Sequence, residues 1–127
     1  MGGKIPWRAV AKSLVLHEES DCRELIKRVL LQNGHEVVAF NEEKEALAWI
    51  RSNPVDLAIV SLEARGGDNQ IWRKLRALKK DLKIIVLSRY TFKQLASEAL
   101  TQGADDYLLK PIDIELLETK VRNLKLD

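Results

Sequence analysis

Five short apolar runs alternate along this chain with segments of helical periodicity. The runs occupy residues 14–16, 37–40, 57–60, 84–87 and 107–109. Their apolar residues are consecutive rather than alternating, which is typical of strands buried on both faces of a parallel sheet. Strict alternation of five strands with five helices predicts an α/β fold built on a doubly wound, five-stranded parallel sheet.

Capping residues and glycines indicate where the helices begin and end. We expect Ser20 or Asp21 to cap the first helix and Asn41 to cap the second. Gly34 and Gly103 are expected to end the first and fourth helices. The helix positions expected to face the core are Leu25, Ile26, Val29 and Leu30, then Leu47 and Ile50, then Ile71, Trp72, Leu75 and Leu78, then Phe92, Leu95, Ala96 and Ala99, and, in a helix from about Asp113, Leu117, Val121 and Leu124.

The length of 127 residues fits one ordinary globular domain. Residues 1–12 contain three basic residues and no acidic one, so we interpret them as an N-terminal arm or tail, with the domain at residues 13–127. The formal charge of +2 comes from that arm, because the remainder has 18 basic and 19 acidic residues.

Composition argues against several classes of protein. The charge is too balanced for an obvious nucleic-acid or membrane-surface module, so we expect neither partner. The single cysteine, Cys22, rules out a disulfide framework and fits a reducing cytoplasm, which is the expected localisation. No apolar stretch approaches about 18 residues, so no membrane span is expected. The basic residues of the third helix are expected to form a solvated surface; they are Arg73, Lys74, Arg76, Lys79 and Lys80.

Polar residues close the apolar strands at their carboxyl ends, the edge where parallel sheets bind ligands. Because these strand ends meet at one edge, we expect their side chains to lie close together. The residues concerned are His17, Glu18 and Glu19 after the first strand, Ser61 and Glu63 after the third, Ser88 after the fourth, and Lys110 after the fifth.

These strand ends lie in segments that resemble the response-regulator receiver domain family. The segments are KSLVLHEESDCRELI, NPVDLAIVSLEARGGDNQ, KIIVLSRY and GADDYLLKPID, and the resemblance covers nearly all of residues 12–125. It implies a flavodoxin-like receiver fold with strand order 2-1-3-4-5. It also implies a phosphoryl switch, in which an aspartate ending the third strand accepts the phosphoryl group and two acids after the first strand hold magnesium. A hydroxyl and a lysine then read the phosphate, and an aromatic residue on the fifth strand changes position.

Carried over residue by residue, this resemblance gives a mixed result. Ser88 matches the hydroxyl position, Lys110 the phosphate-reading lysine, and Tyr107 the switch aromatic. Ser61, however, occupies the position of the phosphoacceptor aspartate. A serine hydroxyl does not attack phosphorus without a general base and a positioned donor. We therefore expect no catalytic residue and no enzymatic activity.

The expected metal pocket is also altered, because His17-Glu18 replaces the acidic pair of the family. Magnesium prefers hard oxygen ligands, and His17 would be a poor one, although it could suit a transition metal. Glu18 is the metal ligand if there is any, with Glu19 and Glu63 as weaker candidates. We expect no cofactor to be required and magnesium to bind weakly.

The combined reading is a degenerate receiver, or pseudo-receiver, of two-component signalling that acts by protein–protein interaction without conventional phosphorylation. We expect Lys110 to pair with Glu18 or to hydrogen-bond Ser61, which would hold one switch state. Two alternatives stay open. One is a phosphorelay receiver switched by an unconventional acceptor or metal, and the other is a flavodoxin-like domain that binds a small ligand.

Receivers often signal through the face formed by the fourth helix, fifth strand and fifth helix. The expected partner is a signalling kinase or a downstream effector, and the same face could support a homodimer. One receiver uses almost the whole length, so we expect no output domain here and a signal passed through another molecule. The residues expected on this face are Arg89, Tyr90, Lys93, Tyr107 and Glu115.

Overall fold

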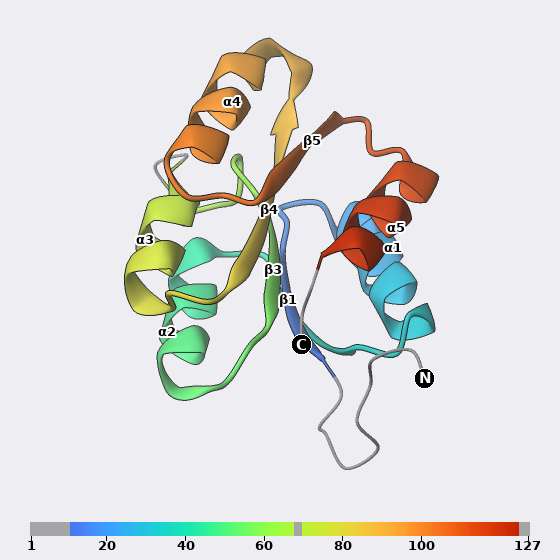
Figure 1. Ribbon diagram of the computed structural model, residues 1–127, viewed down its shortest axis with the longest axis vertical. Helices are drawn as coiled ribbons and strands as arrows, with labels where there is room; N and C mark the ends of the chain where they lie inside the picture. The colour runs from blue at the N-terminus through green and yellow to red at the C-terminus, as the bar shows by residue number, and fades with distance from the viewer. Residues whose placement is uncertain (1–10, 68–69, 125–127) are drawn as a thin grey trace.

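The computed structural model of the chain describes residues 11–67 and 70–124, which form a five-stranded sheet flanked by helices (Figure 1). All neighbouring strands pair in parallel, in the order β2-β1-β3-β4-β5, which confirms the predicted topology. The strands are β1 (Lys12–Leu16), β2 (Glu36–Phe40), β3 (Leu57–Ser61), β4 (Lys83–Arg89) and β5 (Asp106–Lys110). The helices are α1 (Ser20–Gln32), α2 (Glu43–Ser52), α3 (Ile71–Leu78), α4 (Lys93–Thr101) and α5 (Ile114–Asn123).

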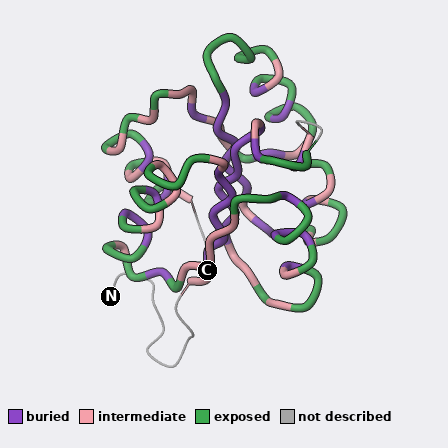
Figure 2. Tube along the Cα trace, turned by 180° about the vertical axis from the view of Figure 1, so that it is seen from behind, coloured by how far each residue is buried: buried purple, intermediate pink, exposed green. Residues whose placement is uncertain are grey.

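The sheet is covered on both faces, which explains why its strands are apolar without alternation. Figure 1 shows α1 and α5 on one side and α2, α3 and α4 on the other. Each side has its own apolar cluster, the first including Val15, Ile26 and Leu117 and the second including Trp72 and Leu75. The burial pattern in Figure 2 follows the central strands, and every residue of β3 is buried. The strand ends are therefore fixed by a rigid core.

Three expected core residues are in fact exposed. Leu25 in α1 and Leu78 at the end of α3 have 40% and 38% of their surface accessible. Phe92 is 41% exposed because residues Tyr90–Phe92 form a 3₁₀ turn, and α4 begins only at Lys93. A 3₁₀ turn has three residues per turn, so it changes the phase of the helical pattern that pointed Phe92 inward.

The expected helix caps are also corrected. No side chain caps α1 at Ser20 or Asp21, because the helix already begins at Ser20 after Glu19. Helix α2 begins at Glu43 rather than next to Asn41, since the Glu43 N–H donates to the Arg65 carbonyl at 2.9 Å and joins the helix start to the loop after β3. The Asp113 carboxylate does cap α5, accepting the Leu116 N–H at 3.1 Å.

The loop after β3 packs tightly on α2. The Glu43 carboxylate is nearly fully buried and pairs with the Lys74 ammonium of α3 at 2.5 Å. A Cβ at Gly67 would collide with that same carboxylate, so a larger residue there would force the Glu43 side chain to shift from its pairing with Lys74. This packing fixes the direction in which the chain leaves Ser61.

The expected N-terminal arm falls mostly on residues 1–10, which lie outside the described residues, and Lys12 is the first residue of β1. Within residues 11–67 and 70–124, no helix combines the length and apolar character needed to cross a bilayer.

Candidate functional site

Parallel pairing brings the polar ends of β1, β3, β4 and β5 to one edge of the sheet. The register places Ser61 beside Leu87 and Arg89 beside Lys110, so the side chains at these ends lie within reach of one another. Five of the expected residues meet in one cluster: Glu18, Ser61, Glu63, Ser88 and Lys110. We call this cluster the edge pocket.

The Lys110 ammonium is the centre of the edge pocket. Its Nζ donates to Glu18 Oε2 at 2.9 Å, to Ser61 Oγ at 2.7 Å and to Glu63 Oε1 at 2.8 Å. An ammonium has three protons, so these three acceptors use its full donor capacity. The expectation that Lys110 would meet Glu18 or Ser61 thus describes only part of the arrangement, because both contacts form together and Glu63 adds a third.

Glu63 links two strand ends through its carboxylate. One oxygen receives the Lys110 ammonium, and the other receives the Ser88 hydroxyl at 3.4 Å. The Glu63 N–H also donates to Ser61 Oγ at 3.2 Å, which holds the loop against the strand end. Sequence reasoning gave this glutamate a weak role, because the loop direction that carries its side chain inward cannot be deduced from spacing alone.

The carboxyl group of Glu18 is strongly acidic in this setting. Burial by itself would raise its pKa, but interactions with the Lys110 ammonium and the Ser61 hydroxyl outweigh burial and lower the pKa to about 2. The side chains of Lys110, Glu18 and Glu63 are only 13%, 19% and 10% exposed. These charges therefore interact with little screening by solvent.

His17 has a structural role at the start of α1. Its imidazole is fully buried, and Nδ1 accepts the backbone N–H of Glu19 at 3.0 Å. The Arg23 guanidinium holds the His17 carbonyl at 3.0 Å. Burial, and then the charge of Lys110, lower the pKa of His17 below its ordinary value. Burial and the Lys110 charge thus both disfavour a second cation at this position beside the edge pocket.

Glu19 points away from the cluster around Lys110. Its carboxylate lies 3.6 Å from the Cys22 sulfur one turn into α1, and the residue is exposed. The acidic tract after β1 thus divides: Glu18 joins the edge pocket, whereas Glu19 lies on the solvent side of the helix start.

A sequence model described as the response regulator receiver domain matches residues 14–122. The chain belongs to the response regulator receiver domain family. This receiver is 33% identical over 114 residues to the two-component response regulator PhoP of Pseudomonas aeruginosa and 32% identical over 108 residues to the response regulator protein FleR of the same organism. The matches cover 89% and 84% of this chain but 51% and 23% of those relatives. The chain therefore spans about half of one relative and a quarter of the other.

Solved structures give the same fold for the receiver. A CheY-like receiver domain protein from Methanospirillum hungatei JF-1 superimposes with a TM-score of 0.82 at 23% identity, covering 90% of this chain and 92% of that one. A response regulator from Thermotoga maritima superimposes with a TM-score of 0.79 at 29% identity, covering 90% and 96%. The module is a receiver domain of two-component signal transduction.

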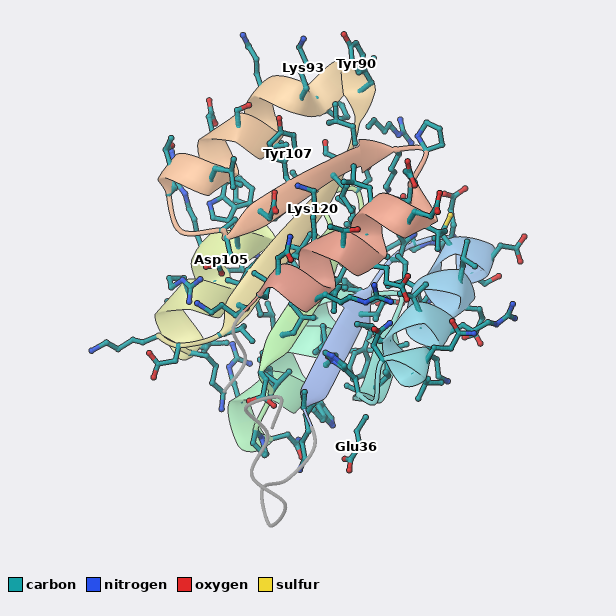
Figure 3. The ribbon with its side chains drawn as sticks, turned by 45° about the vertical axis from the view of Figure 1, so that its right-hand side comes forward. Glu36, Tyr90, Lys93, Asp105, Tyr107 and Lys120 are labelled. Atoms are coloured by element: carbon teal, nitrogen blue, oxygen red, sulfur yellow. The ribbon has the colours of Figure 1, made fainter. Side chains whose placement is uncertain are left out.

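The face of α4, β5 and α5 carries aromatic and charged residues of the receiver. Tyr90 is 63% exposed, and the Lys93 ammonium lies 5.1 Å from the centre of its ring, a cation–π distance. Figure 3 shows Tyr90 and Lys93 pointing outward, whereas Tyr107 lies beside α4. Tyr107 is half-buried against the apolar cluster of that side, a position that the sequence left open. Arg89 and Glu115 are exposed.

The basic residues of α3 are largely engaged within the receiver. Arg73 donates to Gln102 through two nitrogens at 2.9 and 2.6 Å, and Lys74 pairs with Glu43. The Arg76 guanidinium binds several backbone carbonyls between the end of α3 and the start of β5. The solvated basic surface expected here is thus smaller than its charges indicate, because these side chains hold the fold.

Proposed function

We propose that this receiver signals by protein–protein contact and without phosphorylation of an aspartate at the end of β3. The observation that carries the proposal is the occupied Lys110 ammonium, which is satisfied by three side chains of its own chain. In the family, the matching lysine reads an added phosphoryl group. Here an incoming phosphoryl group would have to displace carboxylates that are already bound.

Ser61 supports the proposal through its chemistry. Its oxygen accepts hydrogen bonds from the Lys110 ammonium and from the Glu63 N–H. Two donors directed at the oxygen withdraw electron density and lower its nucleophilicity. The two carboxylates near Ser61 are poorly suited to act as its general base, because the Lys110 ammonium binds both of them and lowers the pKa of Glu18 to about 2. We therefore propose no enzymatic role for this residue.

Glu63 supplies a permanent anion where the family would place a transient one. Its carboxylate contacts both Ser88 and Lys110, the two residues at the phosphate-reading positions. A carboxylate and a phosphoryl group are both oxygen anions that accept from a hydroxyl and an ammonium. We propose that this internal contact holds the receiver in one switch state.

Magnesium, which the family implies, fits this edge pocket poorly. The metal wants an octahedral shell of hard oxygens. Both carboxylates of the pocket are bound to the Lys110 ammonium, and a hydroxyl stands at the end of β3. A divalent cation there would lie against an ammonium whose charge opposes it. We propose that no magnesium is required.

The α4–β5–α5 face is the surface we propose for a protein partner. Exposed aromatic residues beside cations are typical of binding hot spots, and Tyr90, Phe92 and Lys93 meet that description. The relatives are response regulators, which pair with signalling kinases or downstream effectors. A kinase, an effector or a second copy of this chain would be the class of partner.

The decisive test adds beryllofluoride, a phosphoryl analogue, together with magnesium. The readout is the change in amide chemical shifts. We expect the wild-type chain to show no saturable shifts at residues 17–19, 61–63, 88 and 110. The Ser61→Asp variant restores a carboxylate at the end of β3, and adding Glu63→Gln removes the charge of one of the two carboxylates that hold Lys110, while Glu18 keeps its contact. The double variant is the positive control and is expected to respond.

Saturable shifts in the wild-type pocket would overturn the proposal. They would favour a receiver that is still switched through an unconventional acceptor. A response of the double variant combined with a silent wild type would support the internal occupation of Lys110.

A further inference from the structure

Strand β2 forms an edge of the sheet and has an open side. In the described part of the chain, β1 is the only strand that pairs with it. The Glu36 N–H donates to the Ala11 carbonyl at 2.9 Å, so the backbone groups of Glu36 point towards β1. Successive residues of a strand direct their N–H and C=O groups to opposite edges. The backbone groups of Val37 and Ala39 therefore point towards the open side.

The sequence of β2 lacks the features that usually protect an edge strand. Such strands commonly carry charged side chains, prolines or bulges, which discourage pairing with another chain. Residues 37–40 of β2 are all apolar and half-exposed, and the strand contains no lysine or proline. The other edge strand, β5, begins with Asp106 and ends with Lys110, and Asp106 pairs with Lys120 of α5 at 2.8 Å. Of the two edges, β2 is therefore better suited to accept a further strand.

An apolar groove lies on the α2 side of β2. It has a volume of about 300 Å³, and Val38, Trp49 and Pro54 contribute to its apolar lining. Trp49 is only half-buried, and its ring packs against the Phe40 ring with the centroids 6.2 Å apart. A strand added to β2 would direct every second side chain to this face of the sheet. The groove therefore suits apolar side chains at alternate positions of such a strand.

Two carboxylates flank the open edge. Glu36 at the start of β2 and Glu42 just beyond its end are both exposed, and neither forms an ion pair within residues 11–67 and 70–124. Figure 3 shows Glu36 pointing outward from the molecule. Lys12, which also lines the groove, lies one strand further in, and its backbone N–H donates to the Asp56 carboxylate at 2.8 Å. The open edge thus has a negative charge at each end.

We propose that β2 binds an extended, basic peptide segment of a partner protein as a sixth strand of the sheet. Main-chain hydrogen bonds to Val37 and Ala39 hold the segment, and its alternate apolar side chains fill the groove. Lysine or arginine residues at its ends pair with Glu36 and Glu42. This edge lies at the opposite end of the strand order from β5, so the proposal does not rest on the function proposed for the edge pocket or for the α4–β5–α5 face.

A synthetic peptide of sequence KTVTVTVK tests this proposal with the full chain. We expect saturable chemical-shift changes at the amides of Val37 and Ala39 and at the Trp49 indole, and weaker binding as the salt concentration rises. The peptide ETVTVTVE has the same apolar pattern with acidic ends. It is the matched control, and we expect it to bind about fivefold more weakly.

Proline at position 37 tests the main-chain contacts. Val37→Pro removes an N–H that points to the open side and leaves the donors that pair with β1. We expect it to weaken binding of the basic peptide by about tenfold. Val37→Thr keeps the N–H and the β-branched shape, so it is the matched control and should bind as the wild type does. Urea denaturation checks that both variants are folded.

Charge reversal tests the flanking carboxylates on exposed side chains, so it decides the matter even if Val37→Pro does not fold. Glu36→Lys combined with Glu42→Lys should reverse the preference between the two peptides. Glu24→Lys, on an exposed residue of α1, is the control and should leave both affinities unchanged. The proposal would be overturned by the absence of saturable shifts with KTVTVTVK, by equal affinity for the two peptides, or by shifts confined to the α4–β5–α5 face.

Discussion

At the scale of single residues, the Lys110 ammonium decides what the edge pocket can do. It neutralises two carboxylates that lie on different loops and fixes the hydroxyl at the end of β3. Without the cation, Glu18 and Glu63 would face each other across a site that is mostly shielded from solvent. The arrangement is therefore stable only as a set, and each member depends on the lysine.

Replacing Lys110 by alanine tests that dependence. We expect a loss of about 3 kcal/mol in the free energy of unfolding, because two poorly solvated carboxylates lose their cation. Urea denaturation at neutral pH measures the loss. Adding Glu63→Gln to Lys110→Ala should recover part of it, and Lys93→Ala, on an exposed lysine, is the control. A loss below about 1 kcal/mol for Lys110→Ala would contradict this account.

Glu18 gives the receiver a specific response to acid. The pKa of Glu18 is about 2 in the folded chain, against an ordinary value of 4.5. Ionised Glu18 therefore contributes fully to the free energy of unfolding above pH 4.5, and this contribution is lost as the pH falls towards 2. The difference corresponds to at most about 3 kcal/mol. The gap in unfolding free energy between wild type and Glu18→Gln should narrow between pH 5 and pH 2. A difference in unfolding free energy that does not change with pH would show that ionisation of Glu18 is not its source.

At the scale of elements, the end of α3 depends on one guanidinium. Arg76 donates to the carbonyls of Lys80, Leu82 and Gly103 at 2.7, 2.6 and 2.7 Å, so it joins the end of α3 to the loop before β4 and to the segment before β5. A lysine cannot reach several acceptors with a planar fork.

We expect Arg76→Lys to lower the free energy of unfolding by about 2 kcal/mol, because several carbonyls lose a charged donor. Arg73→Lys on the same helix is the matched control, since Arg73 is exposed and contacts a single side chain. Chemical denaturation of both variants checks the difference. Equal losses would show that Arg76 has no special role at the helix end.

Elements that depend on a repeated pattern were predictable from the sequence, and elements that depend on a single contact were not. Consecutive apolar residues identified all five strands, because burial on both faces favours apolar residues at successive positions rather than at alternate ones. The first residue of α2 was mispredicted, since it is set by a backbone hydrogen bond from Glu43 to a distant loop. The burial of Phe92 was mispredicted because a 3₁₀ turn precedes α4.

The same distinction applies to the edge pocket. Strand ends brought Ser61, Ser88 and Lys110 together, as parallel pairing requires. The central position of Glu63 in the cluster was not predictable. The orientation of its side chain depends on a loop that packs against α2 through Gly67 and Glu43. Long-range packing of this kind leaves no periodic trace in the sequence.

At the scale of the whole molecule, the α4–β5–α5 face is where we expect association. Two copies should associate at high protein concentration, and sedimentation velocity should show it. The double variant Tyr90→Ser, Phe92→Ser removes exposed aromatic surface and should give a monomer without loss of stability. Leu31→Ser is the control, because Leu31 is 52% exposed on α1, away from this face. A monomeric wild type at all concentrations would contradict self-association and leave the face to a different protein.

The internal contacts of the edge pocket also affect how long a signal lasts. A receiver that carries an acyl phosphate keeps its signal only until that bond is hydrolysed, so the rate of hydrolysis in the pocket sets the lifetime of the signal. The anion beside Lys110 belongs to the chain itself, so it is neither delivered by a donor nor removed by water. Under the proposed function, the duration of the signal is set outside the pocket. That duration depends on the cellular concentration of the protein and on the lifetime of each complex with a partner.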